Sequence, residues 1–114
     1  MGSSLLGGVA TLMAASLFLL AAGAAGAEDL DGSKLYQEKT CIACHGPDAA
    51  TPILPDYPKL AGQNEAYLLA QMKAIKSLQR TGGNTPAMAG VMHLVNDEEM
   101  AALAKYISGL STCP

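Results

Sequence analysis

The sequence is poor in large aromatic side chains. It contains no Trp, four Tyr and one Phe, and this Phe is residue 18 of an apolar N-terminal stretch. The rest of the chain must therefore build its core mainly from Leu, Ile, Met and Tyr. A small domain with so little apolar bulk needs a disulfide, a metal or another non-protein group to hold its fold.

The first 27 residues lack charge entirely, and all Lys, Arg, Asp and Glu residues follow them. A leucine-rich centre that gives way to Ala25-Gly26-Ala27 is typical of a secretory signal peptide cleaved after Ala27. No Lys or Arg precedes the apolar run, so an uncleaved anchor is the alternative, for which about 20 apolar residues suffice. We therefore predict a signal peptide over residues 1–27 and one exported domain over 28–114, in contact with a membrane only if the signal is retained.

A surplus of basic residues is also missing. Seven Lys and Arg stand against ten Asp and Glu, a net charge of −3. Nucleic-acid binding needs a basic face, so this balance argues against it. It leaves protein partners open.

No segment shows the alternating pattern of a strand, and the fold class predicted is all-α. A first helix begins at Asp31-Gly32-Ser33 and runs to residues 41–45 or just past them. Asn64 is expected to cap a helix over 65–79, and Asn96 to open the last helix with Glu99 in a capping sequence. The expected buried faces are Leu68, Leu69, Met72, Ile75 and Leu78 in the first of these two helices, and Met100, Leu103, Ala104, Ile107 and Leu110 in the second.

Two segments rich in proline and glycine are predicted to be loops. Residues 46–62 contain four prolines, and residues 80–95 contain Gly82-Gly83, Pro86 and Gly90. The second segment is apolar over AMAGVMHLV. We therefore expect it to lie against a buried surface.

The chemistry-bearing motif is CIACH, residues 41–45. Cysteines at i and i+3 of a helical turn point to nearly the same side, so Cys41 and Cys44 can form thioethers with the two vinyl groups of one porphyrin. His45 then follows at the place from which an imidazole reaches the iron. Covalent haem would also supply the missing core.

The motif has two other possible uses. A redox-active dithiol needs no histidine and usually lies in a βαβ context, which is absent from this pattern. A zinc site needs further ligands, and only His93 and Cys113 remain to supply them. Both alternatives are weaker than haem.

A six-coordinate iron needs a second axial ligand. Met72 and Met100 fall on apolar helix faces, where methionine is more often core. Among the loop candidates, Met88 lies between small residues after Pro86, while Met92 is readily explained by packing and His93 is adjacent.

The chain resembles the class I cytochromes c, in particular the short bacterial periplasmic monohaem type. The resemblance rests on GSKLYQEKTCIACHG, YPKLAGQNEAYLLAQM and RTGGNTPAMAGVMHLVNDEEMAALAKYI, in family order. It implies about four helices around one haem c attached through Cys41 and Cys44, with His45 as proximal and Met88 as distal ligand.

The resemblance also implies supporting roles. The carbonyl of Pro58 would accept a hydrogen bond from His45, and Gly32 and Tyr36 would form a close crossing of terminal helices with Tyr106. From the residue types, Arg80 and Asn84 are candidate donors to a haem propionate. Cys113, near the end of the chain, is either an inert thiol or a disulfide partner for another protein or a second copy.

These features predict a periplasmic one-electron carrier rather than an enzyme, exchanging electrons with a redox protein donor and acceptor. The carrier is either a free shuttle or the dedicated cytochrome subunit of a dehydrogenase complex, and the weak net charge favours the subunit because shuttles are usually steered by a strongly charged face. The alternative is a haem enzyme or gas sensor with an open distal position.

Overall fold

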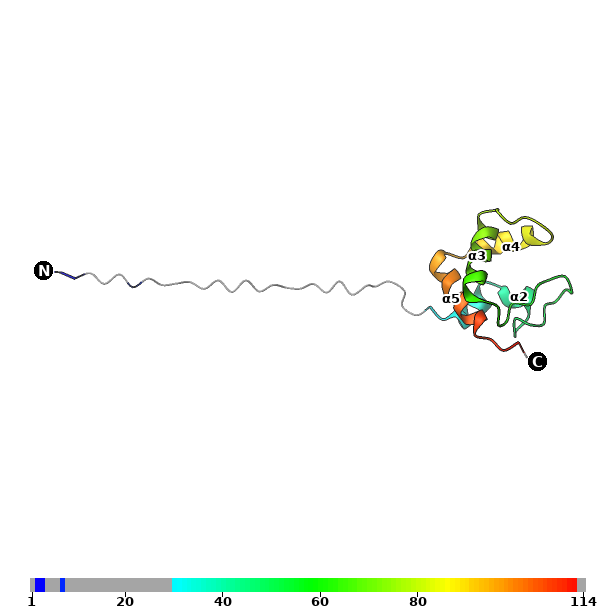
Figure 1. Ribbon diagram of the computed structural model, residues 1–114, viewed down its shortest axis with the longest axis horizontal. Helices are drawn as coiled ribbons and strands as arrows, with labels where there is room; N and C mark the ends of the chain where they lie inside the picture. The colour runs from blue at the N-terminus through cyan, green and yellow to red at the C-terminus, as the bar shows by residue number, and fades with distance from the viewer. Residues whose placement is uncertain (1, 4–6, 8–29, 113–114) are drawn as a thin grey trace.

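The computed structural model describes residues 2–3, 7 and 30–112, and these residues form five α-helices and no strand (Figure 1). The all-α class is therefore confirmed. Most of the predicted signal peptide and Cys113 lie outside the described residues. Within the described part, no helix combines the length and apolar character needed to cross a bilayer. The helices are α1 (Gly32–Glu38), α2 (Cys41–His45), α3 (Glu65–Lys76), α4 (Thr85–Met92) and α5 (Asp97–Ser108).

Helix α5 is central to the packing, because both α1 and α3 lie against it. Its capping box forms as predicted: the side chain of Asn96 accepts from the Glu99 N–H, and the Glu99 side chain accepts from the Asn96 N–H. Met100, Leu103, Ala104 and Ile107 are buried, which confirms the predicted face apart from the half-buried Leu110.

The crossing of α1 and α5 depends on Gly32. A Cβ atom at this position would lie 2.4 Å from Cβ of Tyr106 and 2.6 Å from the carbonyl oxygen of Ala102. The rings of Tyr36 and Tyr106 meet in a tilted arrangement, with centroids 5.9 Å apart and an interplanar angle of 55°. The close crossing expected from the resemblance is present.

The first helix does not continue into the motif as predicted. Thr40 adopts a left-handed backbone with φ 64°, which ends α1 and lets the chain turn before α2 begins at Cys41. The motif therefore occupies a short helix of its own, packed against α1.

Helix α3 begins as predicted, with the Asn64 side chain accepting from the Tyr67 N–H. It ends three residues earlier than predicted, at Lys76, because Leu78 takes a left-handed φ of 61°. Leu78 is 59% exposed, so its assignment to the buried face was wrong.

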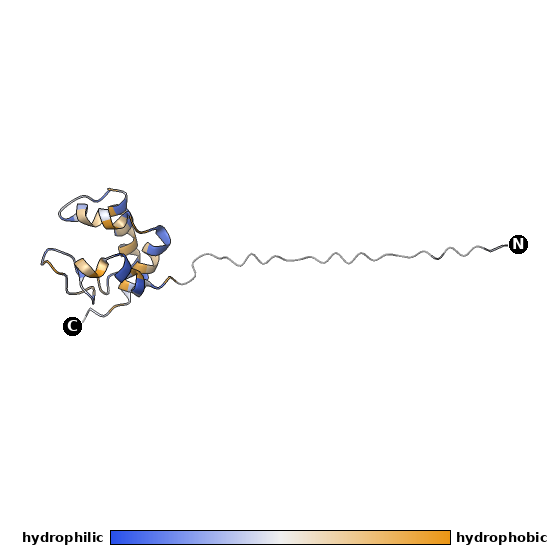
Figure 2. Ribbon diagram, turned by 180° about the vertical axis from the view of Figure 1, so that it is seen from behind, coloured by the Kyte–Doolittle hydropathy of each residue, from blue (hydrophilic) through white to orange (hydrophobic). Residues whose placement is uncertain are grey.

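The predicted loop over 80–95 is also wrong in part, since it contains α4. Pro86 lies in the first turn of this helix, where a missing N–H costs nothing. Gly90 lies in its interior, where glycine weakens a helix without breaking it. Helices α4 and α2 extend from the same side of the α3 and α5 pair, and α4 is apolar over most of its length (Figures 1 and 2).

Candidate functional site

A cavity of about 350 Å³ opens among the helices. This volume is within the range of about 300–1,000 Å³ found for small-molecule and cofactor pockets. Its walls are mainly apolar side chains from α3, α4 and α5, and its rim is polar. The apolar walls include Leu60, Leu68, Met72, Ile75, Met88, Val91, Met92, Leu103 and Ile107, and the other lining residues that bear on the site are Cys41, Cys44, His45, Asp56, Tyr57, Pro58, Gln63, Tyr67, Gln71, Arg80, Asn84 and Thr85.

Both motif cysteines line this cavity, and neither forms a disulfide. Burial raises the pKa of the Cys41 thiol to about 11, so the thiol stays protonated at neutral pH. Dithiol oxidoreductases need a lowered cysteine pKa to populate the thiolate. The environment of Cys41 therefore does not suit that chemistry.

His45 is 5% exposed and lines the same cavity. Its Nδ1 atom lies 2.9 Å from the carbonyl oxygen of Pro58, so the Nδ1–H donates and Nε2 keeps its lone pair. Burial lowers the pKa of His45, while the Pro58 carbonyl opposes this shift. The result is a neutral imidazole with one nitrogen free for a metal.

The turn after the motif is held by polar contacts around Gly46. The buried hydroxyl of Tyr36 donates to the Gly46 carbonyl at 2.7 Å, and Gly46 itself has a φ of 85°. A side chain at Gly46 would collide with the Thr51 carbonyl at 2.2 Å. Asp48 then accepts from the backbone N–H groups of Ala50 and Thr51, which holds its own pKa below the usual value.

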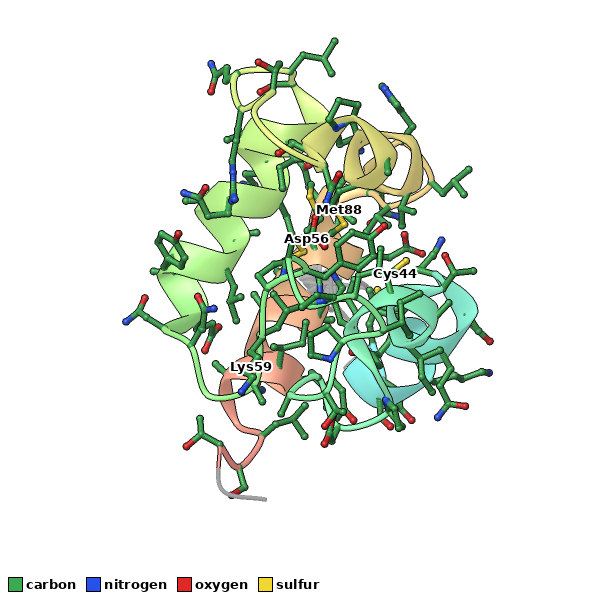
Figure 3. All side chains as sticks on the ribbon, turned by 90° about the vertical axis from the view of Figure 1, so that its right-hand side faces the viewer. Cys44, Asp56, Lys59 and Met88 are labelled. Carbon is green, nitrogen blue, oxygen red and sulfur yellow. The ribbon has the colours of Figure 1, made fainter. Side chains whose placement is uncertain are left out.

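Three methionines line the cavity: Met72, Met88 and Met92. Met88 is half-buried on α4, and Cys44 approaches the cavity from α2 (Figure 3). Met92 is fully buried at the end of α4. Met100 is buried in the core, and His93 is exposed; neither belongs to the lining.

Arg80 and Asn84, the two predicted rim donors, both line the cavity mouth. Arg80 donates from a terminal guanidinium nitrogen to Gln71 Oε1 at 2.9 Å, and Asn84 Nδ2 donates to Asp56 Oδ2 at 2.5 Å. Asp56 was not predicted, and no pattern in the sequence marked it. Gln63, Tyr67 and Gln71 were also missed, although the spacing of four residues places Tyr67 and Gln71 on one side of α3; Gln63 precedes this helix.

The zinc alternative gains no support within the part of the chain that the structure describes. No group of three or more His, Cys, Asp or Glu side chains there could hold a metal ion. His93 lies outside the cavity lining, so it does not join Cys41 and Cys44.

These features define an all-α protein whose C-x-x-C-H turn and methionine-bearing helix share one apolar cavity. The cytochrome c family model matches residues 30–111, so the chain belongs to the cytochrome c family, as a class I monohaem member. This family comprises electron carriers rather than enzymes. Its members bind haem c covalently through the motif that Cys41, Cys44 and His45 form here.

Similar proteins agree with this assignment. Cytochrome c-554(548) of Halomonas halodenitrificans is 42% identical over 69 residues, 60% of this chain and 82% of that protein. The crystal structure of reduced recombinant cytochrome c4 from Pseudomonas stutzeri is similar with a TM-score of 0.62 and 31% identity, over 71% of this chain and 47% of that one. A protein of Stutzerimonas stutzeri named thiosulfate dehydrogenase electron acceptor is 34% identical over 70 residues. The chain spans only 32% of that last relative, so it corresponds to part of the longer proteins.

The cavity fits the cofactor that the family carries. Its free thiols, its neutral histidine and its apolar walls are the groups that covalent attachment, iron ligation and burial of a porphyrin require. The polar rim suits the charged edge of the same group.

Proposed function

We propose that this protein is a periplasmic one-electron carrier in which His45 and Met88 would bind the iron of the haem. The observation that carries the proposal is the shared lining of one cavity by both motif cysteines, by His45 and by Met88. Haem bound there supplies an iron that gains and loses a single electron. With both side chains bound to the iron, no position would remain for a substrate.

His45 is oriented for this role by its hydrogen bond to Pro58. The Pro58 carbonyl fixes the tautomer and the ring orientation, and it makes Nε2 a stronger donor. Because burial lowers the pKa of His45, the ring stays neutral over a wider pH range. Little rearrangement is needed when the charge on the site changes.

Met88 is the better distal candidate of the two methionines on α4. It lies between Ala87 and Ala89, whose small side chains permit a close approach of the helix to a porphyrin. Met92, in contrast, is fully buried at 0% exposure and packs in the core. We assign it to packing.

At the cavity mouth, Arg80 and Asn84 are proposed to donate to the haem carboxylates. Both are exposed donors whose present partners, Gln71 and Asp56, also belong to the rim. A guanidinium and an amide there would offset negative charge at the porphyrin edge.

The electron donor is proposed to be a dehydrogenase in the same compartment. The resemblance to a protein named thiosulfate dehydrogenase electron acceptor supports this class of partner. The predicted signal peptide supports the compartment. Retention by a larger subunit through purification at moderate salt would identify a dedicated subunit, whereas separation would identify a shuttle.

The ligand assignment is tested by optical spectra of Met88→Ala and Met92→Ala. We expect the wild-type oxidised protein to show the far-red sulfur-to-iron band. Met88→Ala should keep covalent haem but lose this band and bind carbon monoxide when reduced. Met92→Ala should keep the band and lose about 2–5 kcal/mol of unfolding free energy as a buried truncation.

Two results would contradict the proposal. Rapid and complete carbon monoxide binding by the reduced wild type would indicate an open distal position and a sensor or enzyme. Loss of the band in Met92→Ala with retention in Met88→Ala would move the ligand to Met92.

A further inference from the structure

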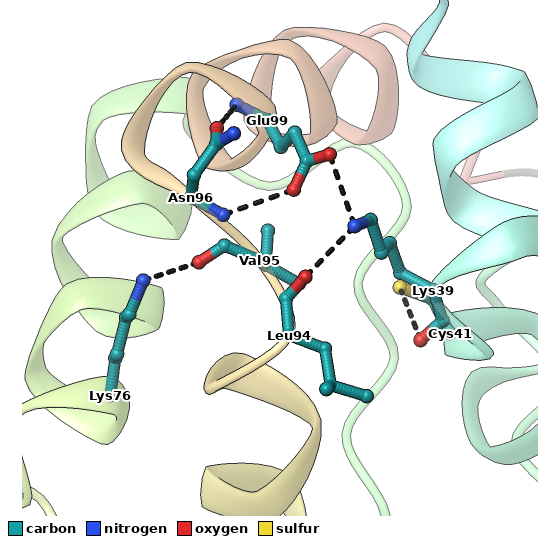
Figure 4. A network of polar contacts seen from close by, with 7 residues as sticks. All are labelled: Lys39, Cys41, Lys76, Leu94, Val95, Asn96 and Glu99. Carbon is teal, nitrogen blue, oxygen red and sulfur yellow. Dashed lines mark hydrogen bonds and ion pairs between the residues drawn. The ribbon is translucent and has the colours of Figure 1, made fainter.

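Two lysines from separate elements hold the segment that joins α4 to α5. Lys39, at the end of α1, donates from Nζ to the carbonyl oxygen of Leu94 at 2.8 Å. Lys76, the last residue of α3, donates from Nζ to the carbonyl oxygen of Val95 at 2.5 Å. Figure 4 shows the two ammonium groups approaching consecutive carbonyls from different helices.

The carbonyls they reach lie in the link between α4 and α5, beyond the last residue of α4. Turns continue past α4 as far as the N–H of Val95, which donates to Met92. The carbonyls of Leu94 and Val95 follow in this link, directly before Asn96, the N-cap of α5. Each lysine therefore makes a charge-assisted hydrogen bond there.

Lys39 has a second partner in the first turn of α5. Its Nζ lies 3.0 Å from Glu99 Oε1, and the two side chains are only 22% and 17% exposed. The other oxygen of Glu99 accepts from the Asn96 N–H. Lys39 thus contacts both sides of the α4–α5 junction and ties it to the end of α1, next to the haem-attachment turn.

Helix packing anchors α4 on one side only. Among the described helices, α4 packs against α3 only. Its position relative to α1 and α2 therefore depends on the connections at its two ends. We call the contacts of Lys39 and Lys76 with Leu94, Val95 and Glu99 the distal latch.

We propose that Lys39 and Lys76 are positioning residues, and that the distal latch keeps α4 closed over the haem cavity. The functional part of this inference rests on the proposed ligation by a methionine of α4. When the latch opens, the C-terminal end of α4 moves away and the distal position becomes accessible to competing ligands. The latch therefore determines how often the proposed methionine ligand dissociates from the iron.

The test uses the haem-loaded protein and the variants Lys39→Met and Lys76→Met, which keep the aliphatic stem and remove the donor. Lys34→Met is the matched control, because Lys34 pairs with Glu38 at 3.7 Å with side chains 70% and 54% exposed. Amide hydrogen exchange in residues 85–95 should become about tenfold faster in both latch variants, as expected for loss of a bond to a charged group. The control should match the wild type.

The affinity of the ferric protein for imidazole should rise about tenfold in the same two variants, since a rarely open state limits apparent affinity. If Lys39→Met does not fold, Lys76→Met carries the test alone because it removes a bond from a different helix. Unchanged exchange in 85–95, or acceleration spread equally over α1 and α5, would overturn the latch. Methionine ligation is tested separately by the far-red band of the wild type. The hydrogen-exchange result does not depend on that ligation.

Discussion

Single residues around the attachment turn are held by specific polar contacts rather than by the packing of large side chains. The Tyr36 hydroxyl, itself buried, reaches the carbonyl of Gly46 and so ties α1 to the residue that follows His45. Burial raises the pKa of Tyr36, so the phenol remains a donor throughout the neutral range. The position of His45 is therefore determined from both sides, by Tyr36 through Gly46 and by Pro58.

Tyr36→Phe should lower the free energy of unfolding by about 1–3 kcal/mol, because it leaves the buried Gly46 carbonyl without its partner while keeping the ring. Guanidinium unfolding of the oxidised protein measures the change. Tyr67→Phe is the control, since Tyr67 is 52% exposed and its hydroxyl can bond to water. Equal unfolding midpoints for the two variants would show that the Tyr36 hydroxyl contributes nothing.

Among the helices, the crossing of α1 and α5 and the placement of α4 decide whether the cavity has its shape. The crossing has no room for a side chain at Gly32, since backbone and Cβ atoms of α5 lie within 2.6 Å of the site. In contrast, a Cβ at Gly90 on α4 would meet nothing within 4 Å. The two helical glycines therefore have opposite requirements.

Gly32→Ala should destabilise the protein by about 1–3 kcal/mol through overpacking of the helix crossing. Gly90→Ala should instead stabilise it by about 0.5–1 kcal/mol, because alanine is the better helix former and has free space. Thermal unfolding of the two haem-loaded variants measures both changes in stability and their signs. A rise in the melting temperature of Gly32→Ala would contradict the observed crossing.

Sequence reasoning located the elements that local chemistry specifies. The helix caps at Asn64, Asn96 and Glu99 are predictable from sequence because a side chain there satisfies N–H groups of its own helix. The break at Thr40 and the early end at Leu78 were missed, since non-glycine residues rarely adopt positive φ and nothing local demands it here.

Helix α4 was missed for a different reason. The glycines and Pro86 of its segment predict a loop, although proline is favourable in a first turn. In the site, the motif marked Cys41, Cys44 and His45, but Asp56 reaches the rim only through a contact with Asn84 across 28 positions of sequence. Such long-range pairings leave no local pattern.

At the scale of the whole molecule, the cavity takes up part of the interior that side chains would otherwise fill. Apolar side chains from α3, α4 and α5 face it, including Leu68, Met88 and Ile107. Without haem this surface would meet water, and the few large side chains of the chain cannot fill the space by small movements. The fold and the cofactor are therefore expected to be inseparable.

Cys41→Ser/Cys44→Ser, expressed with the export signal, should lack covalent haem and lose most of its helical circular dichroism. Its thermal transition should lose cooperativity, because the buried apolar area that stabilises α3 and α5 depends on contact with the porphyrin. Circular dichroism against temperature measures both effects, and binding of a hydrophobic dye should rise as the cavity walls become exposed.

Cys113→Ser is the control for this last experiment, because it removes a thiol outside the C-x-x-C-H motif. It should attach haem and give the wild-type spectrum and melting curve. A native-like, sharply melting double variant without haem would show that the protein part alone sustains the fold, and that the cavity walls are stable when hydrated. Loss of haem from Cys113→Ser would show that attachment needs more than the motif.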